Sequence, residues 1–241
     1  MFDYAMVSKI GGRQVNEDYV TMSVNDSSKC FVVCDGLGGH ESGEIASKLV
    51  GDTIAKCFEE KGDYPMFLDD AFNMAQDKLL ELQRECSVSN GMKTTVAALV
   101  VTDEQMKWAH IGDSRVYHIF GDGSRYERTK DHSIVQQLLD SGEITDADVR
   151  KHDDRNKLLR AMGTVFGKKS FDKSAILERD GKHQFVLMTD GFWENILENE
   201  MLECLNNTKT SEEWLAKMAD IVEGRLDNNS DNYSAICVRV E

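Results

Sequence analysis

Short apolar runs of β type follow one another directly along much of the chain, and this order constrains the fold more than any other feature. Residues common in turns (Gly, Asn, Asp and Ser) separate most of these runs. A parallel sheet would need a helix between successive strands, so the order favours antiparallel sheets covered by helices and argues against a Rossmann fold. The predicted strands are Asp3–Lys9, Tyr19–Val24, Cys30–Cys34, Thr94–Val101, Met106–Ile111, Arg115–Phe120, Phe185–Thr189 and Tyr233–Val240.

Three segments show apolar residues near helical spacing instead. The first carries Ile45, Leu49 and Ile54, the second begins after Pro65, and the third covers Glu212–Leu226. Residues 131–165 differ from both patterns, because they are charged, partly helical and interrupted by glycines, and we predict an exposed subdomain there. The chain has neither repeats nor a Pro- or Ser-rich linker, so we expect one domain over residues 1–241.

Charge and hydropathy exclude several classes of function. The formal net charge of −15 repels nucleic acid, and no apolar stretch approaches the roughly 18 residues of a membrane span. The first residues lack the basic and apolar segments of a signal peptide, so we expect a cytoplasmic protein. None of the six cysteines forms a C-x-x-C pair, and we expect them to be small buried hydrophobes.

Acidic residues stand at the ends of several predicted apolar strands. A carboxylate just beyond a buried strand is held rigidly at the sheet edge, and several that converge there repel one another unless cations neutralise them. Hard oxygen ligands suit Mg²⁺ or Mn²⁺. Each Asp-Gly or Gly-Asp pair, taken alone, is more typical of an ordinary turn than of a metal site. The residues in question are Glu17, Asp18, Asp35, Asp113, Asp190 and Asp231.

Taken together and in order, these segments resemble the metal-dependent protein phosphatase family known as PPM, or type 2C, in its bacterial-type, stand-alone form. Each motif is weak alone, but the ordered set spans nearly the whole chain. The matching segments are Arg13-x-x-Asn16-Glu17-Asp18, Asp35-Gly36-Leu37-Gly38-Gly39-His40, Gly112-Asp113-Ser114-Arg115, Asp131-His132-Ser133, Thr189-Asp190-Gly191 and Asp231-Asn232. The resemblance implies an α+β fold, a four-layer α-β-β-α sandwich of two antiparallel sheets flanked by helix pairs, with a flap over about residues 131–165.

The resemblance also implies roles for single residues. Asp35 would bridge two Mn²⁺ or Mg²⁺ ions, and the Gly36 carbonyl would complete one site, which Glu17 would reach through water. Asp190 and Asp231 would complete the other site. Asp113, with Asp190, would match a third metal site. Asp18 would orient a water that attacks the phosphate, and Arg13 would bind the phosphate itself.

The implied activity is hydrolysis of phosphoserine and phosphothreonine in proteins by a metal-bridging hydroxide, without a phosphoenzyme. A guanidinium such as that of Arg13 suits bidentate phosphate recognition. The implied partners are phosphorylated proteins made by a Ser/Thr kinase, and a monomer is expected. An inactive phosphoprotein-binding module with the same fold is the alternative, although all the metal-binding aspartates are present.

One departure from the family pattern concerns the chemistry. Many members have His directly after Asp-Gly as a candidate general acid, whereas this chain has Leu37, which leaves His40 as a weak candidate.

The segment Gly163–Ser170 has glycine and lysine residues like a P-loop, but its spacing is one residue short, so we do not expect a nucleotide site. None of the cysteines has the C-x₅-R spacing of a cysteine phosphatase.

Overall fold

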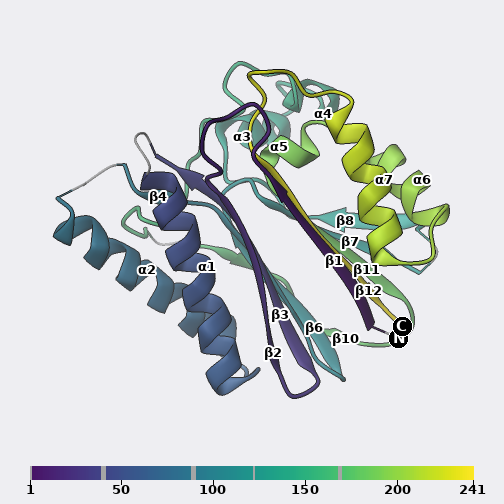
Figure 1. The fold of residues 1–241 in the computed structure, drawn as a ribbon, viewed down its shortest axis with the longest axis horizontal. Helices are drawn as coiled ribbons and strands as arrows, with labels where there is room; N and C mark the ends of the chain where they lie inside the picture. The colour runs from purple at the N-terminus through teal and green to yellow at the C-terminus, as the bar shows by residue number, and fades with distance from the viewer. Residues whose placement is uncertain (1, 39–41, 88–90, 122, 168–169) are drawn as a thin grey trace.

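Two antiparallel β-sheets pack face to face in the computed structural model, which describes residues 2–38, 42–87, 91–121, 123–167 and 170–241 (Figure 1). The first sheet has the order β1 (Phe2–Lys9), β12 (Tyr233–Val240), β11 (His183–Met188), β7 (Arg115–Phe120) and β8 (Arg125–Arg128). The second has the order β10 (Leu177–Glu178), β6 (Gln105–Ile111), β5 (Val96–Val101), β3 (Ser28–Leu37) and β2 (Asp18–Asn25). Two short strands extend it, since β4 (Lys93–Thr94) pairs with β3 and β9 (Asp172–Lys173) pairs with β6.

Helices cover the outer face of each sheet. On one side α1 (Ser42–Lys61) lies over β2 and β3, with α2 (Phe67–Glu85) packed beside it (Figure 1). On the other side α7 (Ser211–Glu223) lies over β1 and β12, with α6 (Glu198–Asn206) packed beside it. The short helices α3 (Ile134–Ser141), α4 (Asp146–Val149) and α5 (Asp190–Trp193) lie near one end of the sandwich. The four-layer α-β-β-α arrangement of antiparallel sheets is therefore confirmed.

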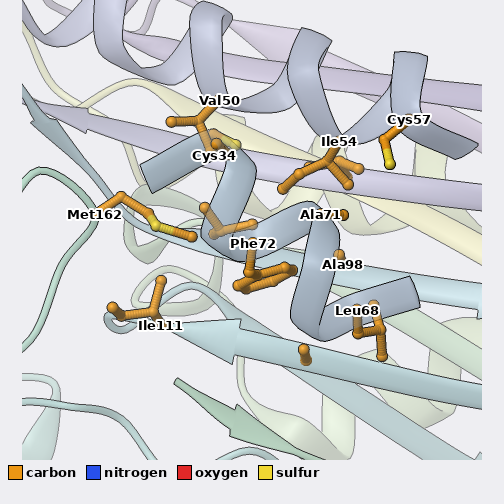
Figure 2. Close-up of a cluster of buried hydrophobic side chains, with 14 of the residues drawn as sticks. Cys34, Val50, Ile54, Cys57, Leu68, Ala71, Phe72, Ala98, Ile111 and Met162 are labelled. Carbon is orange, nitrogen blue, oxygen red and sulfur yellow. The ribbon is translucent and has the colours of Figure 1, made fainter. Parts of the chain in front are cut away.

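Apolar side chains fill the three spaces between these layers. Phe31, Leu99 and Phe185 are fully buried between the two sheets. Phe72 of α2 and Ile54 of α1 pack on the sheet at Ala98 of β5 (Figure 2). Burial of one such large side chain contributes roughly 1.5–3 kcal/mol, so both sheets are held firmly on both faces.

Several local predictions need correction. Strand β3 continues through Asp35 to Leu37, so Asp35 lies inside the strand and not beyond it. The predicted strand over Thr94–Val101 is broken at Thr95 into β4 and β5. Five cysteines are buried as expected, but Cys86 is exposed. None of the helices in the described ranges is both long and apolar enough to cross a membrane.

Two buried histidines between the sheets carry a pH prediction. The Nε2 of His183 donates to the Asp180 carbonyl at 2.7 Å, so its Nδ1 accepts from Nε2 of His118 at 2.9 Å. Burial, and then the charge of His183, lowers the pKa of His118 to about 4 from 6.5. Since the unfolded chain binds this proton first, stability is expected to fall as pH drops from 6.5 to 4, by at most about 1.4 kcal/mol per pH unit.

Urea unfolding at pH 7 and pH 5 measures the effect, with His118→Phe as the matched variant. Phe suits the ring environment of His118, which stacks on Phe185 at a centroid distance of 4.6 Å. The difference in stability between the two pH values should shrink in the variant. An equal pH dependence in both proteins would assign the acid sensitivity to other groups.

Candidate active site

The acidic residues meet because four strands start or stop at the same end of the sandwich. In the second sheet, Asp18 at the start of β2 is the register partner of Asp35 in β3. In the first sheet, β11 ends at Met188 just before Asp190, and β12 starts at Tyr233 just after Asp231. A cleft of about 500 Å³ opens there. Its lining includes Arg13, Glu17, Asp35, Gly36, Asp113, Asp190 and Asp231.

Backbone contacts fix Asp35 and Gly36 in this cleft. The Asp35 N–H donates to Thr95 Oγ1 at 3.0 Å, and the Asp35 carbonyl accepts from the Thr95 N–H at 2.8 Å. A Cβ on Gly36 would lie 2.2 Å from the Gly43 carbonyl oxygen, at the start of α1. Only glycine permits this approach, so the residue after Asp35 lets the backbone of β3 pass close to the start of α1.

Asn232 joins the N-terminal loop to the start of β12. Its side-chain nitrogen donates to the carbonyls of Ile10 and Val15, and its oxygen accepts from the Glu17 N–H at 2.8 Å. In the sequence Asn232 stands out only as part of the Asp231-Asn232 motif, and its local pattern does not reveal this role. The contacts span more than two hundred residues of sequence, and they place Glu17 beside Asp231.

Burial and mutual repulsion raise the pKa values of these carboxyl groups. The pKa of Asp18 rises to about 8, mainly through burial, although Ser234 and Thr189 hydroxyls oppose the shift. Burial first, and the charge of Asp231 second, raise the pKa of Asp190 to about 6. The pKa of Asp35 rises well above its ordinary value because the residue is desolvated beside Asp190, Asp18 and Asp113. A site that resists ionisation in this way favours bound cations.

Asp113 lies in the turn between β6 and β7, as the sequence predicted. Burial, and then the charge of Asp190, raise the pKa of Asp113 well above its usual range. Its Oδ1 atom is buried and has no hydrogen-bond partner among the described residues. An unpaired buried carboxylate oxygen is costly, so this atom fits a cation ligand better than an ordinary turn residue.

Arg13 lies at the rim of the cleft, where it binds Asp231. The distance from Arg13 Nη2 to Asp231 Oδ2 is 2.9 Å, and the two side chains are 52% and 41% exposed. No local sequence pattern indicates this ion pair, whose partners are 218 residues apart. Such an exposed pair contributes little to stability, so Arg13 can leave Asp231 at small cost.

The segment predicted as a flap reaches the cleft from the other side. Asn156 and Leu158 line the cleft, and Arg155 contacts Glu194 at 3.1 Å. Burial, and then Asp190, raise the pKa of Glu194 to about 7. The flap is therefore tied to the residues that follow α5. The candidate general acid His40 lies outside the described residues.

The donor set suits Mg²⁺ or Mn²⁺ better than Zn²⁺. Within the described residues, no group of three or more His, Cys, Asp or Glu side chains is already gathered closely enough to hold one ion. Mg²⁺ commonly keeps several waters and takes only one or two carboxylates. The separate carboxylates, the Gly36 carbonyl and the orphaned Asp113 oxygen therefore fit hydrated cations.

Comparison with known proteins decides the family. The model of the family described as "Protein phosphatase 2C" matches residues 7–229. The chain belongs to the protein phosphatase 2C, or PPM, family. It is accordingly a protein phosphatase, a hydrolase, and the resemblance noted in the sequence is confirmed.

Individual PPM phosphatases agree with this assignment. The chain is 30% identical over 236 residues to the serine/threonine phosphatase stp of Listeria innocua, covering 94% of this chain and 90% of the relative. The crystal structure of Stp1 from Staphylococcus aureus superposes with a TM-score of 0.88 at 28% identity, covering 100% of this chain and 96% of that one. The crystal structure of the catalytic domain of PstP in complex with two manganese ions superposes with a TM-score of 0.84 at 26% identity, covering 100% of this chain and 99% of that one.

Proposed function

We propose that this PPM phosphatase hydrolyses phosphoserine and phosphothreonine in proteins. The observation that carries the proposal is the convergence of Asp35, Asp113, Asp190 and Asp231 on one cleft, with Arg13 at its rim and Asp18 buried beside Asp35. Similarity to serine/threonine phosphatases and to manganese-bound PstP supports it. Phosphorylated proteins are the proposed partners, a monomer the proposed state and the cytoplasm the proposed location.

The proposed metal ligands are Asp35, Asp190, Asp231, Asp113, the Gly36 carbonyl and Glu17. Bound Mn²⁺ or Mg²⁺ would lower the pKa of a coordinated water and neutralise charge on the phosphate. Asp18 hydrogen-bonds Thr189 Oγ1 at 2.9 Å, which fixes its carboxyl so that it can orient the attacking water. Water attacks phosphorus directly, so no residue of the chain is phosphorylated.

The central test is a phosphatase assay on a phosphothreonine peptide with Mn²⁺, repeated after chelation. Turnover that chelation abolishes and Mn²⁺ restores supports the proposal. Peptide binding without turnover would favour the alternative, an inactive module that binds phosphoproteins. All the acidic residues expected to bind metal line the cleft, which speaks against that alternative; they are Glu17, Asp35, Asp113, Asp190 and Asp231.

Arg13→Ala is expected to raise KM and to lower kcat, because the guanidinium binds the phosphate and its contact strengthens as charge develops. A hydrogen bond to a charged group contributes about 1.5–3 kcal/mol, so kcat/KM should fall by on the order of 10- to 100-fold. Steady-state kinetics on one phosphopeptide measure both constants. Arg13→Lys keeps the charge but lacks the bidentate fork of a guanidinium, so its kcat/KM should lie between those of the wild type and Arg13→Ala. Unchanged kcat/KM in the Ala variant would make Arg13 a surface residue.

A further inference from the structure

The segment Asp131-His132-Ser133 matches the family pattern but has no role in the proposed mechanism. In the structure, Asp131 binds Arg115, and Ser133 Oγ accepts from the Gln136 N–H at the start of α3. The middle residue, His132, is turned toward the turn that carries Asp113. The segment therefore connects the start of the flap to the cleft.

His132 holds this turn by two hydrogen bonds to one residue. The Gly112 N–H donates to His132 Nδ1 at 3.2 Å, and the His132 N–H donates to the Gly112 carbonyl at 2.8 Å. A backbone N–H can only donate, so Nδ1 is the acceptor and the ring proton is on Nε2. That proton points to Asp172 Oδ2 at 3.2 Å. Asp172 thus fixes the ring in the form that can accept from Gly112.

Gly112 needs such an external constraint. Its φ is +98°, and a Cβ there would lie 2.5 Å from Thr95 Cγ2. Glycine is required, but glycine alone leaves the turn free to take other conformations. Two further contacts, from Trp193 Nε1 to the Asp113 carbonyl at 3.0 Å and between Thr95 and Ser114 hydroxyls at 2.6 Å, hold the residues that follow. His132 is the contact on the N-terminal side of Asp113.

We propose that His132 is a positioning residue, whose Nδ1 holds the Gly112 N–H so that the buried Asp113 carboxylate is aimed at a cation. This inference rests on the proposed function, in which Asp113 is a metal ligand. Because the third site, which Asp113 would share with Asp190, has the fewest protein ligands, we expect its ion to bind most weakly. The affinity of an ion that has few protein ligands depends strongly on the position of each ligand. Residues that orient metal ligands typically change affinity or activity by 10- to 100-fold when they are replaced.

Asn and Leu form a matched pair for testing His132. Both branch at Cγ and have nearly the same shape, and both lose the ring that stacks on His110 at a centroid distance of 4.5 Å. Asn places its oxygen the same number of bonds from Cβ as Nδ1, so it can accept from Gly112. Leu leaves the Gly112 N–H without its acceptor.

The experiment is a calorimetric titration of each metal-free protein with Mn²⁺, together with kinetics on a phosphothreonine peptide. In His132→Leu the weakest Mn²⁺ site should lose about tenfold in affinity or more, and the tighter sites should be unchanged. Asp113→Ala should remove the same weak site. In both variants kcat should fall while KM for the peptide stays the same. His132→Asn should keep the affinity of the weak site within about threefold of the wild type, which is about half of one tenfold step in free energy.

The outcomes separate this inference from the proposed function. Equal losses in the Asn and Leu variants would assign the effect to ring packing and would overturn the inference, as would a weak site unchanged in His132→Leu. If His132→Leu does not fold, His132→Gln replaces it, because its terminal atoms extend past the Nδ1 position. If the wild-type protein hydrolyses the peptide with Mn²⁺ in only its tight sites, the inference is overturned but the proposed function is not. If the wild-type protein binds Mn²⁺ but does not hydrolyse the peptide, the proposed function is overturned. The Mn²⁺ affinities of the His132 variants would still decide the role of His132.

Discussion

Asp35→Asn is expected to abolish turnover of a phosphothreonine peptide while leaving the protein folded. Asp35 is near enough to Asp190 and Asp18 for their charges to raise its pKa, and it is the proposed bridge between the two core cations. Loss of that ligand removes several kcal/mol of transition-state stabilisation, and at 1.36 kcal/mol per tenfold we expect kcat to fall by at least about 10³-fold. Retention of wild-type activity with Mn²⁺ would overturn the assignment.

The same substitution is expected to stabilise the metal-free protein. Burial and neighbouring acids raise the pKa of Asp35, so ionising it at pH 8 costs free energy in the folded state that is absent in the unfolded chain. Asn has no charge to bury. Urea unfolding in chelator measures this gain, and Asp77→Asn, on an exposed position of α2, is the charge-matched control. A metal-free Asp35→Asn protein less stable than the control would mean that the carboxyl is needed for folding.

The antiparallel architecture was predictable because strand order depends on local composition. Tyr233–Val240 has the predicted boundaries, and Arg115–Phe120 does as well. The turn at Asp113 was predictable for the same reason, since the flanking runs are apolar and β-branched. The fold class and the PPM family, both expected from the ordered motifs, are confirmed.

The contacts that assemble the cleft were not predictable from local pattern. The cross-strand pair of Asp18 and Asp35 depends on the register of β2 and β3, and the contact of Asn232 with Ile10 joins the two ends of the chain. The sequence indicated which acids stand near strand ends. It could not show that Thr95 interrupts a strand so that its hydroxyl reaches the Asp35 N–H. The roles of the individual acids stay proposals for the experiments above.

Helices α5 and α6 were missed for a different reason. Helix α5 has only four residues, too few for a 3.6-residue period to be visible, and it begins at Asp190 itself. Helix α6 carries its buried residues Met201, Cys204 and Leu205 within nine positions. Tertiary packing against α7 and the first sheet stabilises such helices more than their own sequence does.

The largest expected loss of stability follows from Asp131→Ala. Asp131 binds Arg115 through two hydrogen bonds, Nε–Oδ1 at 2.9 Å and Nη2–Oδ2 at 2.7 Å, and Arg115 is only 1% exposed. Arg115 also donates to Tyr117 and lies 3.4 Å from the Trp193 ring centroid. Removing one partner of a buried pair leaves an uncompensated charge, so we expect a loss of about 3–5 kcal/mol in urea unfolding of the metal-free protein.

A double variant tests whether the loss comes from the stranded guanidinium. In Arg115→Met with Asp131→Leu both charges are absent, and apolar side chains replace a buried pair at little net cost in other proteins. The double variant should therefore be more stable than Asp131→Ala alone, although it lacks more native contacts. If the free energy of unfolding of Asp131→Ala is within about 1 kcal/mol of the wild-type value, water must reach Arg115, since only solvation could replace the lost carboxylate. A double variant less stable than the single would mean that Arg115 is held mainly by Tyr117 and Trp193.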